Sequence, residues 1–225
     1  MPLRLTRTIL DNLDLEKPPA TWDWISDHVV LTEGLRLYPF AAVDYPYARG
    51  ICEAADDPRV REVAFVAGTQ IGKSVLAQSW LLCRLATQPA NGIFASSTEK
   101  LARQTARDKM WPMLRACSAT RGQCPKHAKE EASDQIRLRN ATVRVAWSGS
   151  PTTLGDWTAR WGLAGELDKW THQTSEEADA WGLFVKRFGA VNEYQWFAES
   201  TPTYEETSRI WRLLIGGSNC RYQVP

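Results

Sequence analysis

This sequence lacks long apolar runs, an excess of charge of either sign and closely paired cysteines. No hydrophobic stretch approaches the roughly 18 residues that a membrane-spanning helix needs, so we expect no membrane contact. The first 20 residues contain acids and no continuous apolar stretch, so we expect no secretory signal. The 27 basic and 26 acidic residues leave a formal charge of +1, which neither favours nor excludes a nucleic-acid partner.

The cysteines show no strong metal-binding or disulfide pattern. There are 5 of them, with no CxxC pair, and this odd number favours reduced thiols. Cys117, Cys124 and His127 are close enough in sequence to begin a zinc site, but their spacing matches no common zinc pattern. We therefore expect buried or surface thiols and keep the zinc site as an alternative.

The sequence does contain short apolar segments that alternate with longer segments of helical periodicity. This alternation predicts an α/β fold with a mainly parallel sheet covered by helices on both faces. Asn140-Ala141 predicts a hairpin between residues 136–139 and 142–147. The other expected strands are Arg61–Ala67, Ile93–Ser97, Arg160–Gly165 and Gln195–Ser200, and the expected helices are Tyr47–Ala55, Lys73–Thr87, Thr98–Cys117, Ser175–Phe188 and Glu205–Leu214.

One strand–turn–helix segment has the pattern of a phosphate-binding loop, or P-loop. The usual pattern is GxxxxGK[ST], and Gly72, Lys73 and Ser74 match its end, whereas Ala67 stands at its first glycine position. Such a loop directs backbone N–H groups at phosphate oxygens, while the lysine adds positive charge and the hydroxyl binds Mg²⁺. The alternative is a glycine turn with a solvated lysine. The predicted phosphate-binding residues are Ala67, Gly68, Thr69, Gln70, Ile71, Gly72, Lys73 and Ser74.

A second apolar segment, residues 161–170, leads into acidic residues. A P-loop enzyme needs such a strand, because carboxylates at its end hold Mg²⁺ and orient the attacking water. The usual end is Asp-Glu, but this sequence has Gly165 followed by Glu166. We predict Glu166 as a catalytic residue with an indirect contact to Mg²⁺, and Asp168 as a second candidate. The alternative is an exposed strand end with solvated charges.

Five segments, in this order, resemble the large terminase subunits of tailed phages, in the lambda-like branch. They are residues 57–63 leading into the loop at 67–74, residues 96–102 with 112–114, residues 149–151, residues 165–170, and residues 199–203 with 208–210. The resemblance covers roughly residues 20–225. It implies a P-loop NTPase fold of the ASCE type, with residues 1–56 as an arm and adenine-side lid and residues 57–225 as the ATPase core.

The resemblance also implies ATP and Mg²⁺ as cofactors and assigns roles at the site. Lys73 and a Ser74-bound Mg²⁺ neutralise charge on the phosphates, and Glu166 orients the water. Thr201, or its neighbour Ser200, senses the loss of the γ-phosphate and transmits it.

Two further roles remain open between alternatives. The adenine ring is expected to stack on Tyr45 or Tyr47, and core packing of these rings is an equal alternative. An arginine finger is expected from Arg103 or Arg107, which share a helix face at i, i+4 spacing, with Arg84 as another option. The alternative is a solvated basic face.

For the whole protein, the resemblance implies packaging of double-stranded viral DNA into the procapsid. Expected partners are DNA held through its phosphates, the small terminase subunit, the portal protein and further copies of the chain in a ring. The expected location is the cytoplasm of the infected bacterial host, with transient docking on the procapsid. The family normally continues into a nuclease domain, so we interpret this chain, which stops at Pro225, as a fragment without nuclease activity.

Gly165 departs from the family pattern and keeps two other functions open. Without the usual aspartate, hydrolysis is expected to be weak unless Glu166 or Asp168 compensates. The alternatives are a helicase-like P-loop DNA translocase and a nucleotide-binding assembly module with little turnover.

Overall fold

The computed structural model describes residues 17–33, 36–127, 130–171 and 179–216. Within this part of the chain, a six-stranded sheet has the order β3-β8-β7-β4-β6-β5. Its neighbouring strands pair in parallel, except that β5 runs antiparallel to β6. The strands are β3 (Glu62–Val66), β4 (Gly92–Ser96), β5 (Gln135–Arg137), β6 (Thr142–Trp147), β7 (Trp161–Gly165) and β8 (Gln195–Ser200).

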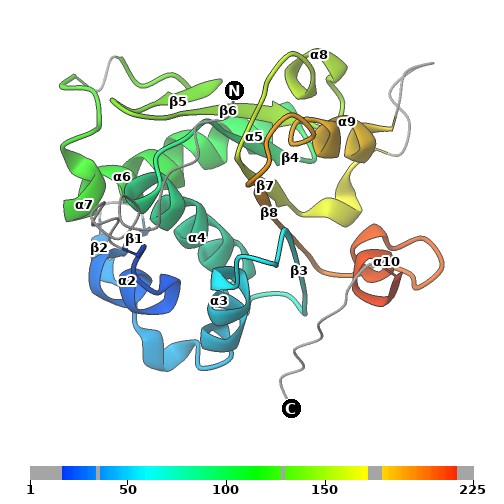
Figure 1. Ribbon diagram of the computed structural model, residues 1–225, viewed down its shortest axis with the longest axis horizontal. Helices are drawn as coiled ribbons and strands as arrows, with labels where there is room; N and C mark the ends of the chain where they lie inside the picture. Colours follow the sequence, from blue (N-terminus) through cyan, green and yellow to red (C-terminus); the bar gives the residue numbers. More distant parts are fainter. Residues whose placement is uncertain (1–16, 34–35, 128–129, 172–178, 217–225) are drawn as a thin grey trace, which may run out of the picture.

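Helices cover both faces of this sheet, as Figure 1 shows for the long helix α4 across its middle and α10 beside β3. The first face carries α2 (Thr21–His28), α3 (Ala48–Asp56), α4 (Lys73–Thr87), α5 (Glu99–Thr105), α6 (Trp111–Ala116) and α7 (Ser118–Arg121). The second face carries α8 (Pro151–Leu154), α9 (Ala180–Lys186) and α10 (Arg209–Gly216). The predicted α/β fold with a mainly parallel sheet is confirmed.

Alternation along the central strands divides the core in two. Leu163 and Phe197 pack in the cluster on the α4 face, whereas their neighbours Ala164 and Ala198 pack in the cluster with α9. Because both faces are covered, β7 and β8 are buried along their whole length. This explains why β7 has no polar side chain, whereas in β8 the polar residues Gln195, Glu199 and Ser200 are themselves buried.

The residues before β3 belong to the same core as α4. Trp24, Ile51 and Ala55 are buried in the cluster on the α4 face. A separate two-stranded sheet, β1 (Val30–Glu33) with β2 (Arg36–Pro39), precedes the short 3-10 helix η1 (Ala42–Asp44). Leu37, Tyr38 and Val43 in this region are large hydrophobic residues that remain exposed.

A buried arginine connects α4 to its surroundings. Arg84, only 4% exposed, donates to the carbonyl oxygen of Ala55 at 2.8 Å and to Gln195 Oε1 at 3.2 Å. Its Nη2 also lies 3.1 Å from Asp56 Oδ1, in an ion pair. Asp56 in turn accepts the backbone N–H of Thr21 at 2.7 Å, at the start of α2. This network fixes α2 and α3 against the sheet.

Most predicted elements are confirmed within a residue or two, and the differences have local causes. The helix expected over 98–117 begins as predicted, with Thr98 Oγ1 accepting from the Leu101 N–H at 3.3 Å. It is then interrupted by a π-helical segment, η2 (Ala106–Met110), before α6. The helix expected from 205 begins instead at Arg209, after a turn. The helix expected from 175 is seen as α9 from Ala180, and residues 175–178 lie outside the described part.

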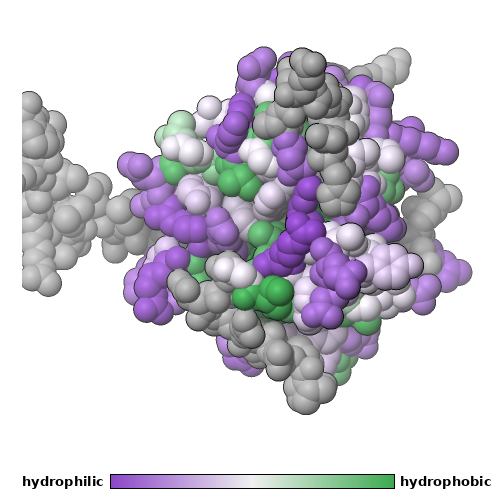
Figure 2. Space-filling model, turned by 90° about the vertical axis from the view of Figure 1, so that its right-hand side faces the viewer, coloured by the Kyte–Doolittle hydropathy of each residue, from purple (hydrophilic) through white to green (hydrophobic). Residues whose placement is uncertain are grey.

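None of the described helices is both long and apolar enough to cross a bilayer. The face on the α10 side is mostly hydrophilic, with small hydrophobic areas between charged side chains (Figure 2). Tyr204, after β8, and Ile215, in α10, are large hydrophobic residues that are exposed.

Close packing of β7 against α9 yields a stability prediction. A Cβ added at Gly162 would overlap Phe188 Cζ and lie 2.9 Å from Trp196 Cβ and 3.0 Å from Phe184 Cζ. Gly162→Ala is therefore expected to lower the free energy of unfolding by about 1–3 kcal/mol, as overpacking does. Urea denaturation followed by tryptophan fluorescence measures this change.

The matched control is Gly182→Ala on α9, where an added Cβ meets nothing within 4 Å. It is expected to stabilise the protein by up to about 1 kcal/mol, because alanine favours a helix over glycine. Equal effects of the two substitutions would contradict this packing of β7.

Candidate functional site

The P-loop candidate lies where β3 ends and α4 begins. Gly68, Thr69 and Gln70 are exposed in the turn, and Lys73 is the first residue of α4. Gly72 has a φ of 81°, in the left-handed region that favours glycine. The Ala67 N–H donates to the Ser200 carbonyl at 3.4 Å, so the loop is attached to β8. The strand–turn–helix geometry expected of residues 67–74 is confirmed.

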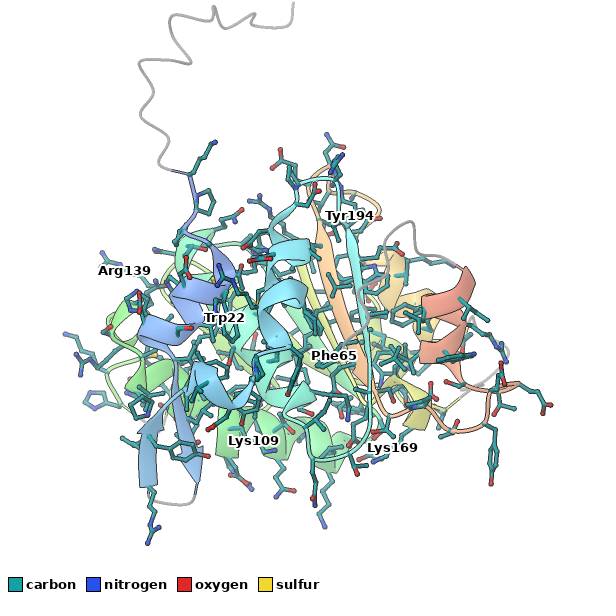
Figure 3. The ribbon with its side chains drawn as sticks, turned by 90° about the horizontal axis from the view of Figure 1, so that it is seen from below. Trp22, Phe65, Lys109, Arg139, Lys169 and Tyr194 are labelled. Carbon is teal, nitrogen blue, oxygen red and sulfur yellow. The ribbon has the colours of Figure 1, made fainter. Side chains whose placement is uncertain are left out.

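Parallel strands bring the other candidates to this same edge. Figure 3 shows Lys169, just after β7, at the opposite end of the sheet from Tyr194, just before β8. The carboxyl ends of β3, β7 and β8 therefore face one region, which is where open α/β sheets bind their ligands.

Lys73 and Ser74 contact β8 directly. Lys73 is 9% exposed, and its Nζ donates to Thr201 Oγ1 at 3.0 Å and to the Gly68 carbonyl oxygen at 2.5 Å. Ser74 Oγ donates to Glu199 Oε1 at 2.9 Å. The structure thus brings together the predicted residues Lys73, Ser74 and Thr201, and adds Glu199.

Glu199 begins residues 199–203, one of the segments that carry the family resemblance, but no individual role was predicted for it. It is 2% exposed, and burial raises the pKa of its carboxyl, opposed by the Ser74 hydrogen bond and the charge of Lys73. No described residue hydrogen-bonds its second oxygen, Oε2, which is also buried. One sequence signal was available, because Gln195, Phe197 and Glu199 alternate along β8 and so share one face.

Glu166 follows β7 with a φ of 51°, an uncommon backbone conformation for a residue with a side chain. Its N–H donates to Glu199 Oε1 at 3.4 Å, while its own carboxylate pairs with Lys169 Nζ at 3.0 Å. The side chain of Glu166 is 36% exposed. The predicted water-orienting residue therefore lies at this edge, beside Glu199.

Asp168 lies in the 3-10 helix η4 (Leu167–Lys169) and binds the segment after β8. Its Oδ2 accepts from the Thr203 N–H at 2.9 Å and from Thr203 Oγ1 at 3.2 Å, and its Oδ1 accepts from the Ile210 N–H at 2.8 Å. Burial alone would raise the pKa of Asp168, but hydrogen bonds from Ile210, Ser208 and Thr203 outweigh it and lower the pKa. Asp168 therefore connects the end of β7 to α10.

Tyr45 and Tyr47 both pack against the loop. Tyr45 Cδ1 lies 2.9 Å from where a Cβ on Gly72 would be, so the ring occupies the space that glycine leaves. The Tyr47 hydroxyl donates to the Ile71 carbonyl oxygen, and burial raises its pKa. Both side chains are half-buried, so each has a face outside the core.

The arginine candidates differ in their availability. Arg103 donates to Glu99 Oε1 at 2.8 Å and lies over the Trp147 ring. Arg107 pairs with Asp108 at 2.7 Å, and its side chain is 68% exposed. Arg84 as an arginine finger is wrong, because its guanidinium is buried among α3, α4 and β8.

The alternative zinc site finds no support. Cys117 is buried, and the Cys124 thiol donates to the Thr120 carbonyl oxygen at 3.5 Å. Across residues 17–33, 36–127, 130–171 and 179–216, no cluster of three His, Cys, Asp or Glu side chains has the arrangement to hold a metal ion.

Comparison with known families gives one match over most of the chain. A family model described as phage terminase large subunit gpA, ATPase domain, matches residues 39–225. No curated protein sequence matches the chain.

Among solved structures, the chain is similar to the large terminase of the HK97 bacteriophage, with a TM-score of 0.66 and 13% identity over 88% of this chain. The match covers 40% of that longer protein. It is also similar to the large terminase ATPase domain of Thermus phage P74-26, with a TM-score of 0.50 and 17% identity over 77% of this chain and 71% of that one. At these identities the likeness concerns the fold.

The Asp168 contacts yield a prediction with a defined pH dependence. Asp168→Asn removes the charge and one acceptor, so it is expected to lower the free energy of unfolding at pH 7 by about 1–2 kcal/mol, a value limited by the partial exposure of the carboxylate. Because the folded pKa of Asp168 lies below its usual 3.8, its contribution is complete above that pH and is lost as the pH falls through the folded pKa.

Urea denaturation at several pH values tests this. The difference between the variant and the parent protein is expected to be constant from pH 7 to 5 and to shrink below about pH 4. Asp134→Asn, at an exposed aspartate, serves as the control and is expected to change stability by less than about 0.5 kcal/mol. A difference for Asp168→Asn that grows on acidification would contradict the assignment.

Proposed function

Because the chain belongs to the ATPase-domain family of the phage terminase large subunit gpA, we propose that it binds ATP with Mg²⁺ and hydrolyses it. The observation that carries this proposal is the meeting of Lys73, Ser74 and Thr201 at the carboxyl edge of the sheet. Such a loop at a helix N-terminus attracts phosphate through backbone N–H groups and a fixed positive charge.

The residues at this edge fit a hydrated magnesium ion. Mg²⁺ takes oxygen ligands and keeps several waters, and the Ser74 hydroxyl and Glu199 carboxylate supply oxygens of this kind. Glu199 Oε2 is buried with no hydrogen-bond partner among the described residues, so the site contains a polar atom in need of one. When bound, the ion supplies neutralisation of phosphate charge.

Each protein group has a distinct task in this proposal. A lysine ammonium has three donors, and Gly68 and Thr201 accept from Lys73, which leaves a donor for a phosphate oxygen. Ser74, whose hydroxyl donates to Glu199, would be a ligand of the metal. The Glu166 carboxylate would accept a hydrogen bond from the attacking water and so orient it toward the terminal phosphorus.

Phosphate loss would reach α10 by a short route. Thr201, which contacts Lys73, is separated from Thr203 by one residue, and Thr203 is hydrogen-bonded to Asp168. Asp168 also holds the Ile210 N–H in the first turn of α10. A change in the Lys73–Thr201 contact therefore acts on α10, which we propose as the element that transmits hydrolysis.

The segment before β3 supplies the adenine side. We propose that residues 1–56 act as an arm and lid and residues 57–225 as the ATPase core, with the adenine ring on Tyr45 or Tyr47. The packing of both rings against the loop supports this.

In the whole protein we propose that hydrolysis drives double-stranded viral DNA into the procapsid. The partners would be DNA, held without sequence specificity, the small terminase subunit and the portal protein, in the host cytoplasm and transiently at the procapsid. Copies of the chain would form a ring in which Arg103 or Arg107 reaches a neighbour's site, and the exposure of Arg107 favours Arg107. A binding module with little turnover is the second candidate, because Gly165 carries no carboxylate.

Phosphate release from ATP with Mg²⁺ tests the proposal, measured with and without duplex DNA. Lys73→Ala is expected to lower the rate about 10²–10³-fold, because it removes a donor to the transferring phosphate. Lys186→Ala, at an exposed position on α9, is the matched control and is expected to leave the rate unchanged.

Binding of a fluorescent ATP analogue is measured in parallel. Binding that depends on Lys73, without any phosphate release, would favour the binding module over the ATPase. Absence of ATP binding by the parent chain would contradict the proposal.

A further inference from the structure

The end of β7 lacks the carboxylate that a P-loop enzyme places there, because the position is Gly165. Gly165 is in register with Glu199 on the neighbouring parallel strand β8. Residues in register on adjacent strands project to the same face, so a side chain at 165 would point where Glu199 points. A Cβ built on Gly165 lies 3.7 Å from Glu199 Oε1, at ordinary contact distance.

Glu199 therefore extends into the space in front of Gly165. Adjacent strands are about 4.8 Å apart, a separation that a glutamate side chain can span. One carboxylate oxygen accepts from Ser74 Oγ at 2.9 Å, so it already contacts the hydroxyl of the P-loop. The other oxygen is buried without a hydrogen-bond partner among the described residues.

The buried Glu199 carboxylate lowers the stability of the folded protein when no ligand is bound. A buried carboxylate with an unsatisfied oxygen destabilises a protein unless something completes its interactions. Glu199 is 2% exposed and lies near the carboxyl end of β8, between Phe65 on β3 and Gly165 on β7. A hydrated cation beside Ser74 would satisfy the free oxygen.

The other nearby acids have different partners. Glu166 is paired with Lys169, and Asp168 accepts the N–H groups of Thr203 and Ile210. Of these three acids, Glu199 is the one that accepts a hydrogen bond from the Ser74 hydroxyl.

We propose that Glu199 replaces the missing aspartate from the adjacent strand, so that its carboxylate binds the water shell of the nucleotide-bound Mg²⁺ beside Ser74. This inference rests on the proposed ATP site. The sequence predicted that Glu166 both orients the water and contacts Mg²⁺ indirectly. In this inference Glu199 holds the water shell of the metal, and Glu166 orients the attacking water.

Manganese binding tests the inference independently of hydrolysis. Free Mn²⁺ gives a six-line electron paramagnetic resonance signal, so titration in the presence of ADP yields its apparent Kd for the protein–ADP complex. Glu199→Gln is expected to weaken Mn²⁺ binding about 10–100-fold, as loss of an outer-shell carboxylate does. Glu166→Gln is the matched control, with an expected change of less than about threefold.

A relocation of the carboxylate provides the second variant. Gly165→Asp combined with Glu199→Ser moves the carboxylate to β7, where an added Cβ has only ordinary contacts. This double variant is expected to bind Mn²⁺ at least tenfold more tightly than Glu199→Ser alone. Equal Mn²⁺ affinities for Glu199→Gln and the parent chain, or no recovery in the double variant, would overturn the inference.

ADP binding in EDTA separates this inference from the function on which it rests. Glu199→Gln is expected to bind metal-free ADP as the parent does, whereas Lys73→Ala loses that binding. If the parent chain bound no ADP, the ATP site itself would be refuted. If ADP bound normally but Glu199→Gln left the Mn²⁺ affinity unchanged, only the inference about Glu199 would be refuted.

Discussion

The parallel pairing of β8 between β3 and β7 is the constraint on which the site depends. It places three strand ends in one region, so that the loop after β3, the acids after β7 and the polar end of β8 meet. Ser74 and Lys73 each bond to β8, and Asp168 bonds to the segment that follows it. Without this register, residues more than a hundred positions apart in sequence would have no reason to interact.

The site also contains groups that the fold tolerates at a cost. Glu199 Oε2 is buried without a hydrogen-bond partner in the described part of the chain, and Glu166 adopts a left-handed backbone conformation. Strain and unsatisfied polar groups of this kind concentrate where a protein binds or reacts. Asp168 is the opposite case, because its hydrogen bonds fix the segment between β8 and α10 and lower its pKa. An acid with an unsatisfied oxygen, Glu199, and an acid whose hydrogen bonds are made within the protein, Asp168, thus lie at the same edge of the sheet.

Most helices and strands could be predicted from the sequence because local signals specify them. Gly72 followed by Lys73 marked the start of α4, and Thr98 marked the start of α5. The π-helical segment at 106–110 was missed although Pro112 follows it, because a proline has no N–H to donate to the Asp108 carbonyl and so disturbs the preceding helical turn. The start of α10 was predicted too early, at Glu205, because the residue that caps the helix is Ser208. Its hydroxyl accepts from the Trp211 N–H. Arg84 and Glu199 were misjudged or missed for a different reason: their roles come from neighbours on other strands and helices, which one sequence does not reveal.

A crystal structure of the chain with Mg²⁺ and a non-hydrolysable ATP analogue would show whether the nucleotide and metal occupy this site. We expect the phosphates to lie against the backbone of residues 68–73, with Lys73 on the terminal phosphates. We also expect a metal ion bound by Ser74 whose water ligands contact Glu199. Phosphates bound elsewhere, or a metal whose shell does not include Glu199, would contradict the proposed site.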